Sequence, residues 1–283
     1  MSALPTDSRV SPTTGPFRTW VTTRQLPLFF VLAFVLSWLP WGLAAVGVIS
    51  EGWQNPLGPL LALLIVVGIA ERWPGVRREL SRLVAFRAHW GWYLAAVGLP
   101  VLVRLVAIGA TARTGGLTIS TAGLQPWTAI LTLFPIVVLF GGPFGEEPGW
   151  RGYALPRLAR NRSLLAATGL LAVPWALWHL PLFFEHGRLD LANLIPEILQ
   201  IGLVAIVLTW IYFGSGQNVV LAILLHGVNN TLASYLRPLV GDADQPRLSW
   251  ALAVGWAVSA LIILAAGGLR ERAASGANTA IRR

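Results

Sequence analysis

A chain of 283 residues that is 55% hydrophobic and only 12% charged cannot bury all of its apolar surface in one water-soluble core. Its mean hydropathy of +0.65 points to lipid as the solvent, and the absence of Cys excludes disulfides, thiolate metal sites and a cysteine nucleophile. The formal net charge of +9 comes from Arg alone and is spread over alternate loops, so we assign it to membrane orientation and expect no nucleic-acid partner.

Eight apolar stretches approach or exceed the roughly 20 residues that cross a hydrocarbon core of about 30 Å. In chain order they cover residues 26–49, 57–70, 90–108, 126–141, 164–184, 191–213, 219–236 and 250–268. The predicted fold class is therefore all-α, a polytopic bundle of about eight transmembrane helices. The predicted organisation is a cytoplasmic N-terminal tail over residues 1–25, a transmembrane domain over residues 26–269, and a cytoplasmic C-terminal tail over residues 270–283.

The distribution of Arg predicts how the chain is oriented, because Arg in short loops is retained on the cytoplasmic side. Arg gathers before the first stretch, between the second and third, after the fourth, and at the C-terminus, whereas the intervening loops hold few. An even number of spans with both termini cytoplasmic fits this pattern. We expect an integral protein of the plasma membrane, surrounded by membrane lipid.

Polar side chains at membrane depth are costly and must face a partner, a cavity or a substrate. The first such cluster contains Glu146, Glu147 and Arg151. If a helix starts at Pro148, both carboxylates lie at its positive end. Adjacent helical residues point about 100° apart, so Glu147 can pair with Arg151 and leave Glu146 free as a general base. The alternative is an interfacial helix cap with a solvated salt bridge.

Two further clusters lie on the predicted spans 164–184 and 219–236. His179 follows Trp175 by one helical turn, which predicts that the two rings pack together. His226 and Asn230 are also one turn apart, so both can point into the same cavity. Each cluster alone has a structural interpretation, as a satisfied core His or as hydrogen bonds between helices. Three clusters on three spans favour one shared site.

Together these groups supply what amide hydrolysis needs. Glu146 with His179 can activate water, while His226 with Asn230 can donate to the developing oxyanion. A second assembly has Glu146, His179 and His226 around zinc with one open position. The expected cofactor is therefore either zinc or none, and the residues do not decide between them.

In these residues the chain resembles the CAAX protease and bacteriocin-processing (CPBP, or Abi) intramembrane proteases, which include the prenyl-protein endopeptidases. Three motifs carry the resemblance in the family's order and spacing: Glu-Glu-x-x-x-Arg at positions 146–151, Phe-x-x-x-His at 175–179 with Trp175 in place of Phe, and His-x-x-x-Asn at 226–230. The resemblance covers about residues 126–236, which is the expected protease core.

The resemblance implies roles for individual residues. Glu146 and His179 would activate water, and His226 and Asn230 would stabilise the oxyanion. Glu147 and Arg151 would support the site by positioning the start of a helix. The replacement of Phe by Trp175 would alter an aromatic packing partner and no catalytic group.

The activity that the resemblance implies is an intramembrane endopeptidase, either glutamate-dependent or metal-dependent. Its substrate would be a membrane-associated protein or peptide, of which a lipidated, CAAX-like sequence is one example. The same polar groups also suit a different class, a non-proteolytic transporter or a bacteriocin-immunity protein. The sequence lacks the inverted symmetry that many transporters have, which favours the protease.

Overall fold

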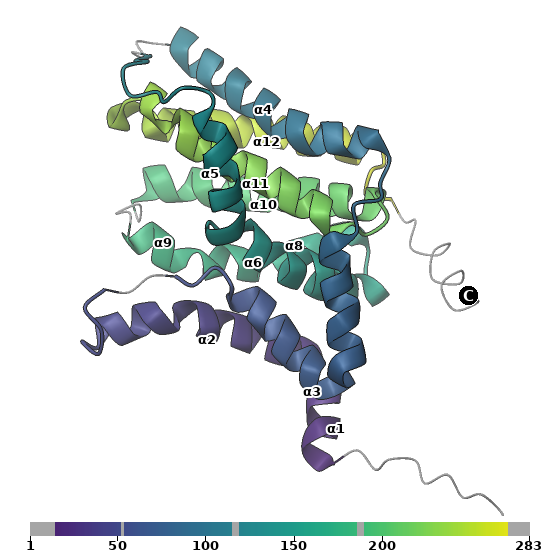
Figure 1. Ribbon diagram of the computed structural model, residues 1–283. Coiled ribbons are helices and arrows are strands. Elements are labelled where there is room, and N and C mark those ends of the chain that lie inside the picture. Colours follow the sequence, from purple (N-terminus) through teal and green to yellow (C-terminus); the bar gives the residue numbers. More distant parts are fainter. Residues whose placement is uncertain (1–14, 52–53, 115–118, 186–189, 271–283) are drawn as a thin grey trace, which may run out of the picture.

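The computed structural model describes residues 15–51, 54–114, 119–185 and 190–270. Within these ranges the regular secondary structure is helical, apart from one isolated bridge between Ile119 and Val240. The predicted all-α bundle is confirmed (Figure 1). Its α-helices are α1 (Pro16–Thr23), α2 (Gln25–Ala45), α3 (Gly58–Ser81), α4 (Trp90–Arg113), α5 (Ala129–Phe140), α6 (Pro143–Glu147), α7 (Leu155–Leu158), α8 (Leu164–Trp178), α9 (Leu180–Glu185), α10 (Leu191–Gly214), α11 (Val219–Leu236) and α12 (Gln245–Ala265). A π-helix, η2 (Pro148–Ala154), connects α6 to α7.

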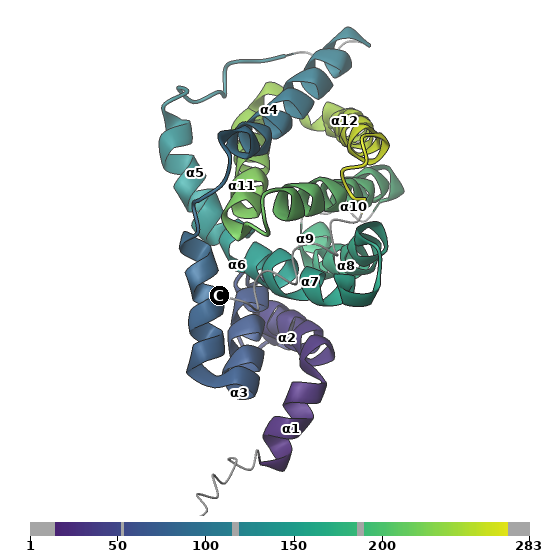
Figure 2. The ribbon, with the colours of Figure 1, turned by 90° about the vertical axis from the view of Figure 1, so that its right-hand side faces the viewer.

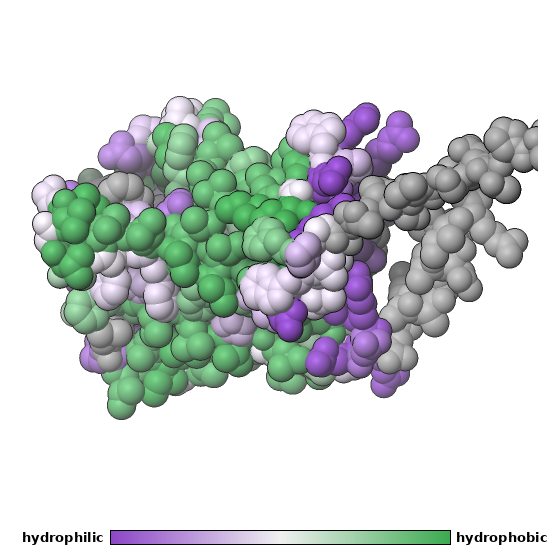
Figure 3. All heavy atoms as spheres, turned by 90° about the horizontal axis from the view of Figure 1, so that it is seen from below, coloured by the Kyte–Doolittle hydropathy of each residue, from purple (hydrophilic) through white to green (hydrophobic). Residues whose placement is uncertain are grey.

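The described helices are suited to a membrane in length, composition and surface. Seven apolar segments are long enough to span it: α2, α3, α4, the continuous segment Ala129–Asn161, α10, α11 and α12. The shorter apolar helix α8 and its continuation α9 together occupy the remaining predicted stretch, 164–184. Hydrophobic side chains cover most of the surface seen in Figure 3, and hydrophilic ones gather mainly at the end that carries α1. This chain is an integral membrane protein.

Helix α3 bends sharply where the second predicted stretch ends. Arg72 has a φ of 58°, and Pro74 follows it. Because Pro74 has no N–H, it cannot donate to the carbonyl of Ala70 four residues earlier. The guanidinium of Arg18 on α1 donates to that carbonyl instead, from Nε at 3.1 Å and from Nη2 at 3.0 Å. A helix within the predicted N-terminal tail therefore caps a break in the transmembrane domain.

Charged side chains beyond the bend tie α3 to the π-helix. Glu79 accepts hydrogen bonds from Arg78 at 2.7 Å and from Arg82 at 3.1 Å. Arg82 Nη1 also donates to the carbonyl of Gly152 in η2 at 2.9 Å. Backbone carbonyls in a π-helix lack the regular i+4 donors of an α-helix, so a side-chain donor of this kind stabilises the wide turn. The polar end of α3 thus holds the segment that follows the two Glu residues.

Small residues let the helices around α6 approach closely. A Cβ atom at Gly145 would lie 2.2 Å from the carbonyl oxygen of Pro56, and one at Gly227 on α11 would lie 2.6 Å from Val138 Cγ2 on α5. Such contacts are typical of helix interfaces in membranes. In Figure 2, α6 lies near the centre of the bundle, between α11 on one side and the α2–α3 pair on the other. The segment with the two Glu residues is therefore at the core of the molecule.

Candidate active site

Glu146 lies in the first turn of α6. This helix begins at Pro143, not at Pro148 as the sequence pattern predicted, because Pro143 also suits a first turn. Gly142 precedes the helix with a φ of 112°, a backbone conformation that favours glycine. A Cβ atom at Gly142 would lie 2.3 Å from Glu146 Oε1. Glycine at this position therefore makes room for the carboxylate as well as for the turn.

One oxygen of the Glu146 carboxylate is held by an indole. Glu146 is buried, and its Oε2 accepts a hydrogen bond from Trp175 Nε1 at 2.7 Å. Among the described residues, no donor forms a hydrogen bond with the other oxygen, Oε1. As the spacing predicted, Glu146 is therefore not part of the ion pair made by its neighbour.

Glu147 forms the predicted ion pair with Arg151 and also contacts a histidine. Its Oε1 lies 2.9 Å from Arg151 Nη1, and both side chains are 0% exposed. The same oxygen lies 2.7 Å from His226 Nδ1. The guanidinium of Arg151 is stacked over the Trp175 ring, 3.8 Å from its centroid. Charges buried this deeply require such partners, so these four residues form one interlocked unit.

His179 stands immediately after α8, where the chain turns into α9. Its Nδ1 lies 2.7 Å from the backbone carbonyl of Trp175. A carbonyl can only accept, so Nδ1 carries the proton, and Nε2 has a lone pair in the neutral ring. The Trp175 and His179 rings pack edge to face with centroids 5.5 Å apart, as the one-turn spacing predicted.

Asn230 follows His226 by one turn on α11. Its Nδ2 lies 3.5 Å from the carbonyl oxygen of Gly141, and its Oδ1 accepts a hydrogen bond from Asn229 Nδ2 at 3.3 Å. These contacts direct the Asn230 amide toward the corner between α5 and α6. Glu146 lies just beyond that corner, in the first turn of α6.

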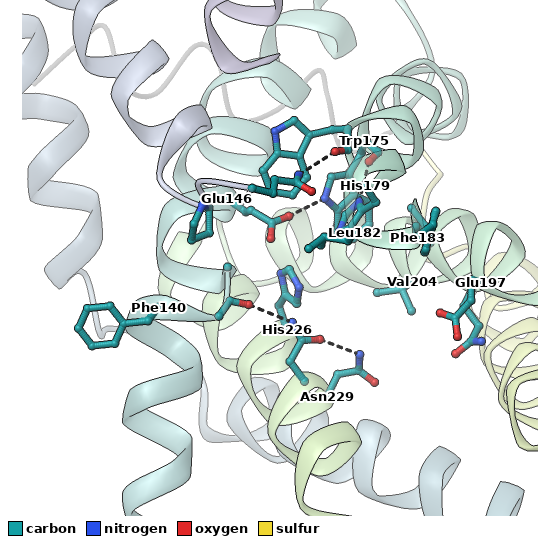
Figure 4. A pocket seen from close by; sticks show the side chains of 18 of the residues that line it. Phe140, Glu146, Trp175, His179, Leu182, Phe183, Glu197, Val204, His226 and Asn229 are labelled. Carbon is teal, nitrogen blue, oxygen red and sulfur yellow. Dashed lines mark hydrogen bonds between the residues drawn. The ribbon is translucent and has the colours of Figure 1, made fainter. Parts of the chain in front are cut away.

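A cavity of about 340 Å³ brings the predicted residues together (Figure 4). Glu146, His179, His226 and Asn230 all line it, although they come from α6, the end of α8, and α11. Glu147 and Arg151 do not line it and lie behind His226. Phe140 is 74% exposed and also lines the cavity, so the cavity opens to the outer surface of the bundle beside this residue.

The opposite wall of the cavity has polar residues that our sequence interpretation missed. Glu197 and Gln200 on α10 line the cavity, and in Figure 4 Glu197 lies on the far side from Glu146. Ser249 on α12 links the two, because its hydroxyl donates to Glu197 at 3.2 Å and its carbonyl accepts from Gln200 at 3.2 Å. Both residues lie within the predicted span 191–213. The argument used for Glu146, that a polar side chain at membrane depth must face a partner, a cavity or a substrate, therefore applies to them as well.

A third missed residue comes from outside the expected protease core. Gln54, in the connection between α2 and α3, lines the cavity and donates from Nε2 to the carbonyl of Trp178 at 2.7 Å. The indole of Trp38 donates to the same carbonyl at 3.1 Å. Trp178 directly precedes His179, so both donors hold the end of α8 in place. A single polar residue in a loop gives no signal of this role in the sequence.

The side-chain geometry does not favour the zinc assembly of Glu146, His179 and His226. Across the part of the chain that the structure describes, no three His, Asp or Glu side chains come together as a group that could hold a metal ion. His226 Nδ1 and Glu147 Oε1 also already satisfy each other. The described side chains therefore do not fit a metal site, and we derive no catalytic step through one.

Comparisons with known proteins match the part of the chain that contains the three motifs. Residues 127–232 match the family model described as type II CAAX prenyl endopeptidase Rce1-like. The chain is also similar to CAAX prenyl protease 2 of Methanococcus maripaludis, with 31% identity over 127 residues. That alignment covers 41% of this chain and 42% of the archaeal protein, so the chain matches less than half of that relative. The resemblance inferred from the three motifs is confirmed, and the family model that matches residues 127–232 describes endopeptidases.

Proposed function

We propose that this chain, whose residues 127–232 match the type II CAAX prenyl endopeptidase Rce1-like family, is an intramembrane endopeptidase that hydrolyses a peptide bond with water activated by Glu146 and His179. The observation that carries the proposal is the single cavity that Glu146, His179, His226 and Asn230 line together. A base, a proton carrier and two donors around one space are the groups that amide hydrolysis requires.

Water would be activated on the side of the cavity formed by α6 and α8. The water oxygen bonds to the carbonyl carbon of the scissile peptide while Glu146 Oε1 accepts a water proton. His179 Nε2, the ring nitrogen that faces away from the Trp175 carbonyl, carries this proton to the leaving nitrogen. The C–N bond then breaks as the lone pair on oxygen re-forms the carbonyl. The products are a carboxylic acid and an amine, which exchange a proton to become a carboxylate and an ammonium.

The oxyanion would be stabilised by α11. As the water attacks, the π electrons of the carbonyl become a lone pair on oxygen, and that negative charge needs donors. His226 donates from Nε2 only when both ring nitrogens are protonated, because Nδ1 already donates to Glu147. The carboxylate of Glu147 stabilises that doubly protonated ring. Asn230 supplies the second donor from its amide.

The substrate class that we propose is a membrane-associated protein or peptide, with lipidated CAAX-like sequences as the first to test. Two observations support it. The family match is to prenyl endopeptidases, and the archaeal relative is named a CAAX prenyl protease. The cavity also opens beside Phe140 on the apolar outer surface, where a substrate held in lipid can approach.

We further propose that the protein resides in the plasma membrane with both termini cytoplasmic. The support is the distribution of Arg, together with the position of α1 and the C-terminal end of α12 toward the same side of the molecule (Figure 1).

The proposal is tested by comparing peptides from cells that contain the wild-type protein with peptides from cells that contain Glu146→Gln. We expect uncleaved substrates to accumulate with Glu146→Gln, and with His179→Ala, while both variants still insert and fold. Glu51→Gln, an exposed carboxylate in a loop, is the matched control and is expected to cleave normally. Purified protein is then tested on a CAAX peptide with and without its isoprenyl group.

Full activity in purified Glu146→Gln or His179→Ala would contradict the proposal. Identical peptides in all the cells, combined with transport in liposomes that responds to a proton gradient, would favour a transporter instead.

A further inference from the structure

Trp175 makes contacts that a role in packing alone does not require. Its side chain is 3% exposed, and its Nε1 donates to Glu146 Oε2 at 2.7 Å. Its backbone carbonyl accepts from His179 Nδ1 at 2.7 Å. One residue therefore contacts both members of the proposed water-activating pair, the first through its indole and the second through its main chain.

The indole N–H is the specific part of this arrangement. The motif that the chain resembles has Phe at this position. Phe has an aromatic ring but no hydrogen-bond donor, so it cannot hold a carboxylate. Two other buried indoles in the same region, those of Trp150 and Trp178, have no hydrogen-bond partner for Nε1 among the described residues. The bond to Glu146 is thus not a general consequence of burying Trp here. The expectation that Trp175 only changes a packing partner is incomplete.

Three side chains pack around the Trp175 ring and fix its orientation toward Glu146. The guanidinium of Arg151 stacks on the ring face at 3.8 Å, and the rings of His179 and His226 meet it edge to face with centroids 5.5 and 5.8 Å away. A ring packed on three sides has one orientation, so its N–H direction is fixed. A hydrogen bond to a carboxylate is also stronger than one between neutral groups.

We propose that Trp175 is a positioning residue that sets the geometry of water activation by holding Glu146 Oε2 through its indole N–H and His179 Nδ1 through its carbonyl. Oε1 of Glu146 and Nε2 of His179 then remain directed at the same water. The inference rests on the proposed endopeptidase function and deepens it. It assigns to Trp175 a contribution to the rate of the chemical step and not to substrate binding.

Removal of the N–H alone tests this role. Trp175→Phe is expected to lower kcat by roughly 10- to 100-fold, the effect of losing one hydrogen bond to a charged group, with KM little changed. The isosteric amino acid 3-benzothienylalanine at position 175, which keeps the bicyclic shape and has sulfur in place of N–H, is expected to lower kcat in the same way. Trp150→Phe is the matched control, since it removes the same atoms from a buried indole without this bond. It is expected to keep kcat within about threefold.

A second measurement does not depend on activity. If Trp175 holds Glu146, Trp175→Phe lowers Tm more in the wild-type background than in the Glu146→Ala background, because the bond is already absent there. Equal Tm losses in both backgrounds, or a kcat for the 3-benzothienylalanine protein that equals that of the wild type, would overturn the inference. If the wild-type protein cleaves no peptide, the endopeptidase proposal fails while the Tm comparison still decides whether Trp175 holds Glu146.

Discussion

His226 Nδ1 lies 2.7 Å from Glu147 Oε1, although the two residues are 79 positions apart in the chain. The same oxygen accepts a hydrogen bond from Arg151 Nη1 at 2.9 Å. A carboxylate held in this way determines which nitrogen of His226 carries a proton and directs the other toward the cavity. Glu147, the last residue of α6, therefore orients His226 in the candidate site.

Loss of Glu147 is expected to destabilise the protein strongly. Glu147→Ala would leave the fully buried Arg151 guanidinium without its counter-charge, which costs about 3–5 kcal/mol. The loss is measured as the change in the free energy of unfolding in detergent. A variant as stable as the wild type would show that Arg151 finds another partner.

Replacement of the pair separates stability from activity. In a double variant with Glu147→Leu and Arg151→Met, apolar side chains of similar size replace both charges, and much of the lost stability should return. Activity should not return, because His226 no longer has a carboxylate at Nδ1. Cleavage by a stable double variant would contradict the orienting role of Glu147.

The turn before Glu146 is expected to tolerate no side chain. Gly142→Ala would place a methyl group 2.3 Å from Glu146 Oε1, at a φ of 112° that L-residues rarely adopt. We expect cleavage to fall by at least 100-fold and stability to fall by about 1–3 kcal/mol. Gly169→Ala on α8 is the control, since a Cβ there meets nothing within 4 Å and alanine favours a helix. Equal activity of the two variants would show that the carboxylate moves without cost.

The cap on the bent helix is expected to stabilise the transmembrane domain. Arg18→Ala removes two hydrogen bonds to the carbonyl of Ala70, which Pro74 cannot replace. We expect the free energy of unfolding to fall by about 1.5 kcal/mol, with cleavage per folded molecule unchanged. Arg77→Ala, which removes an exposed Arg from α3, should have little effect. If both variants lose the same free energy of unfolding, the effect comes from the loss of a positive charge and not from the loss of the cap.

Metal removal is expected to leave cleavage intact. The described His, Asp and Glu side chains form no group of three that could hold a metal, and the water-activating groups of the proposal are a carboxylate and an imidazole. Dialysis against a strong chelator, with the metal content measured before and after, tests this expectation. Loss of cleavage that returns on addition of zinc would contradict it and would require Glu146 and His179 to act as ligands.

The sequence predicted which side chains of the candidate site meet within one helical turn, because these contacts depend on short spacings. Glu147 and Arg151 are four residues apart, as are Trp175 and His179, and such spacings determine which side chains share a helical face. Polar residues in apolar stretches added the second signal, since burial in lipid without a partner is costly. The same signal was present for Glu197 and for Arg104, a buried Arg inside α4, but neither belongs to a motif.

By itself, the sequence determined that this protein lies in a membrane, that it is a helical bundle, and which polar residues face one another within each turn. Those properties follow from hydropathy and from the fixed geometry of a helix, which act over a few residues. Only the tertiary structure decided that Glu147 meets His226, that the indole of Trp175 holds Glu146, that Gly142 makes room for the carboxylate, and that Gln54 supports the end of α8. Each of these contacts depends on how helices pack or on how a turn is shaped, and neither the spacing of residues nor their hydropathy contains that information.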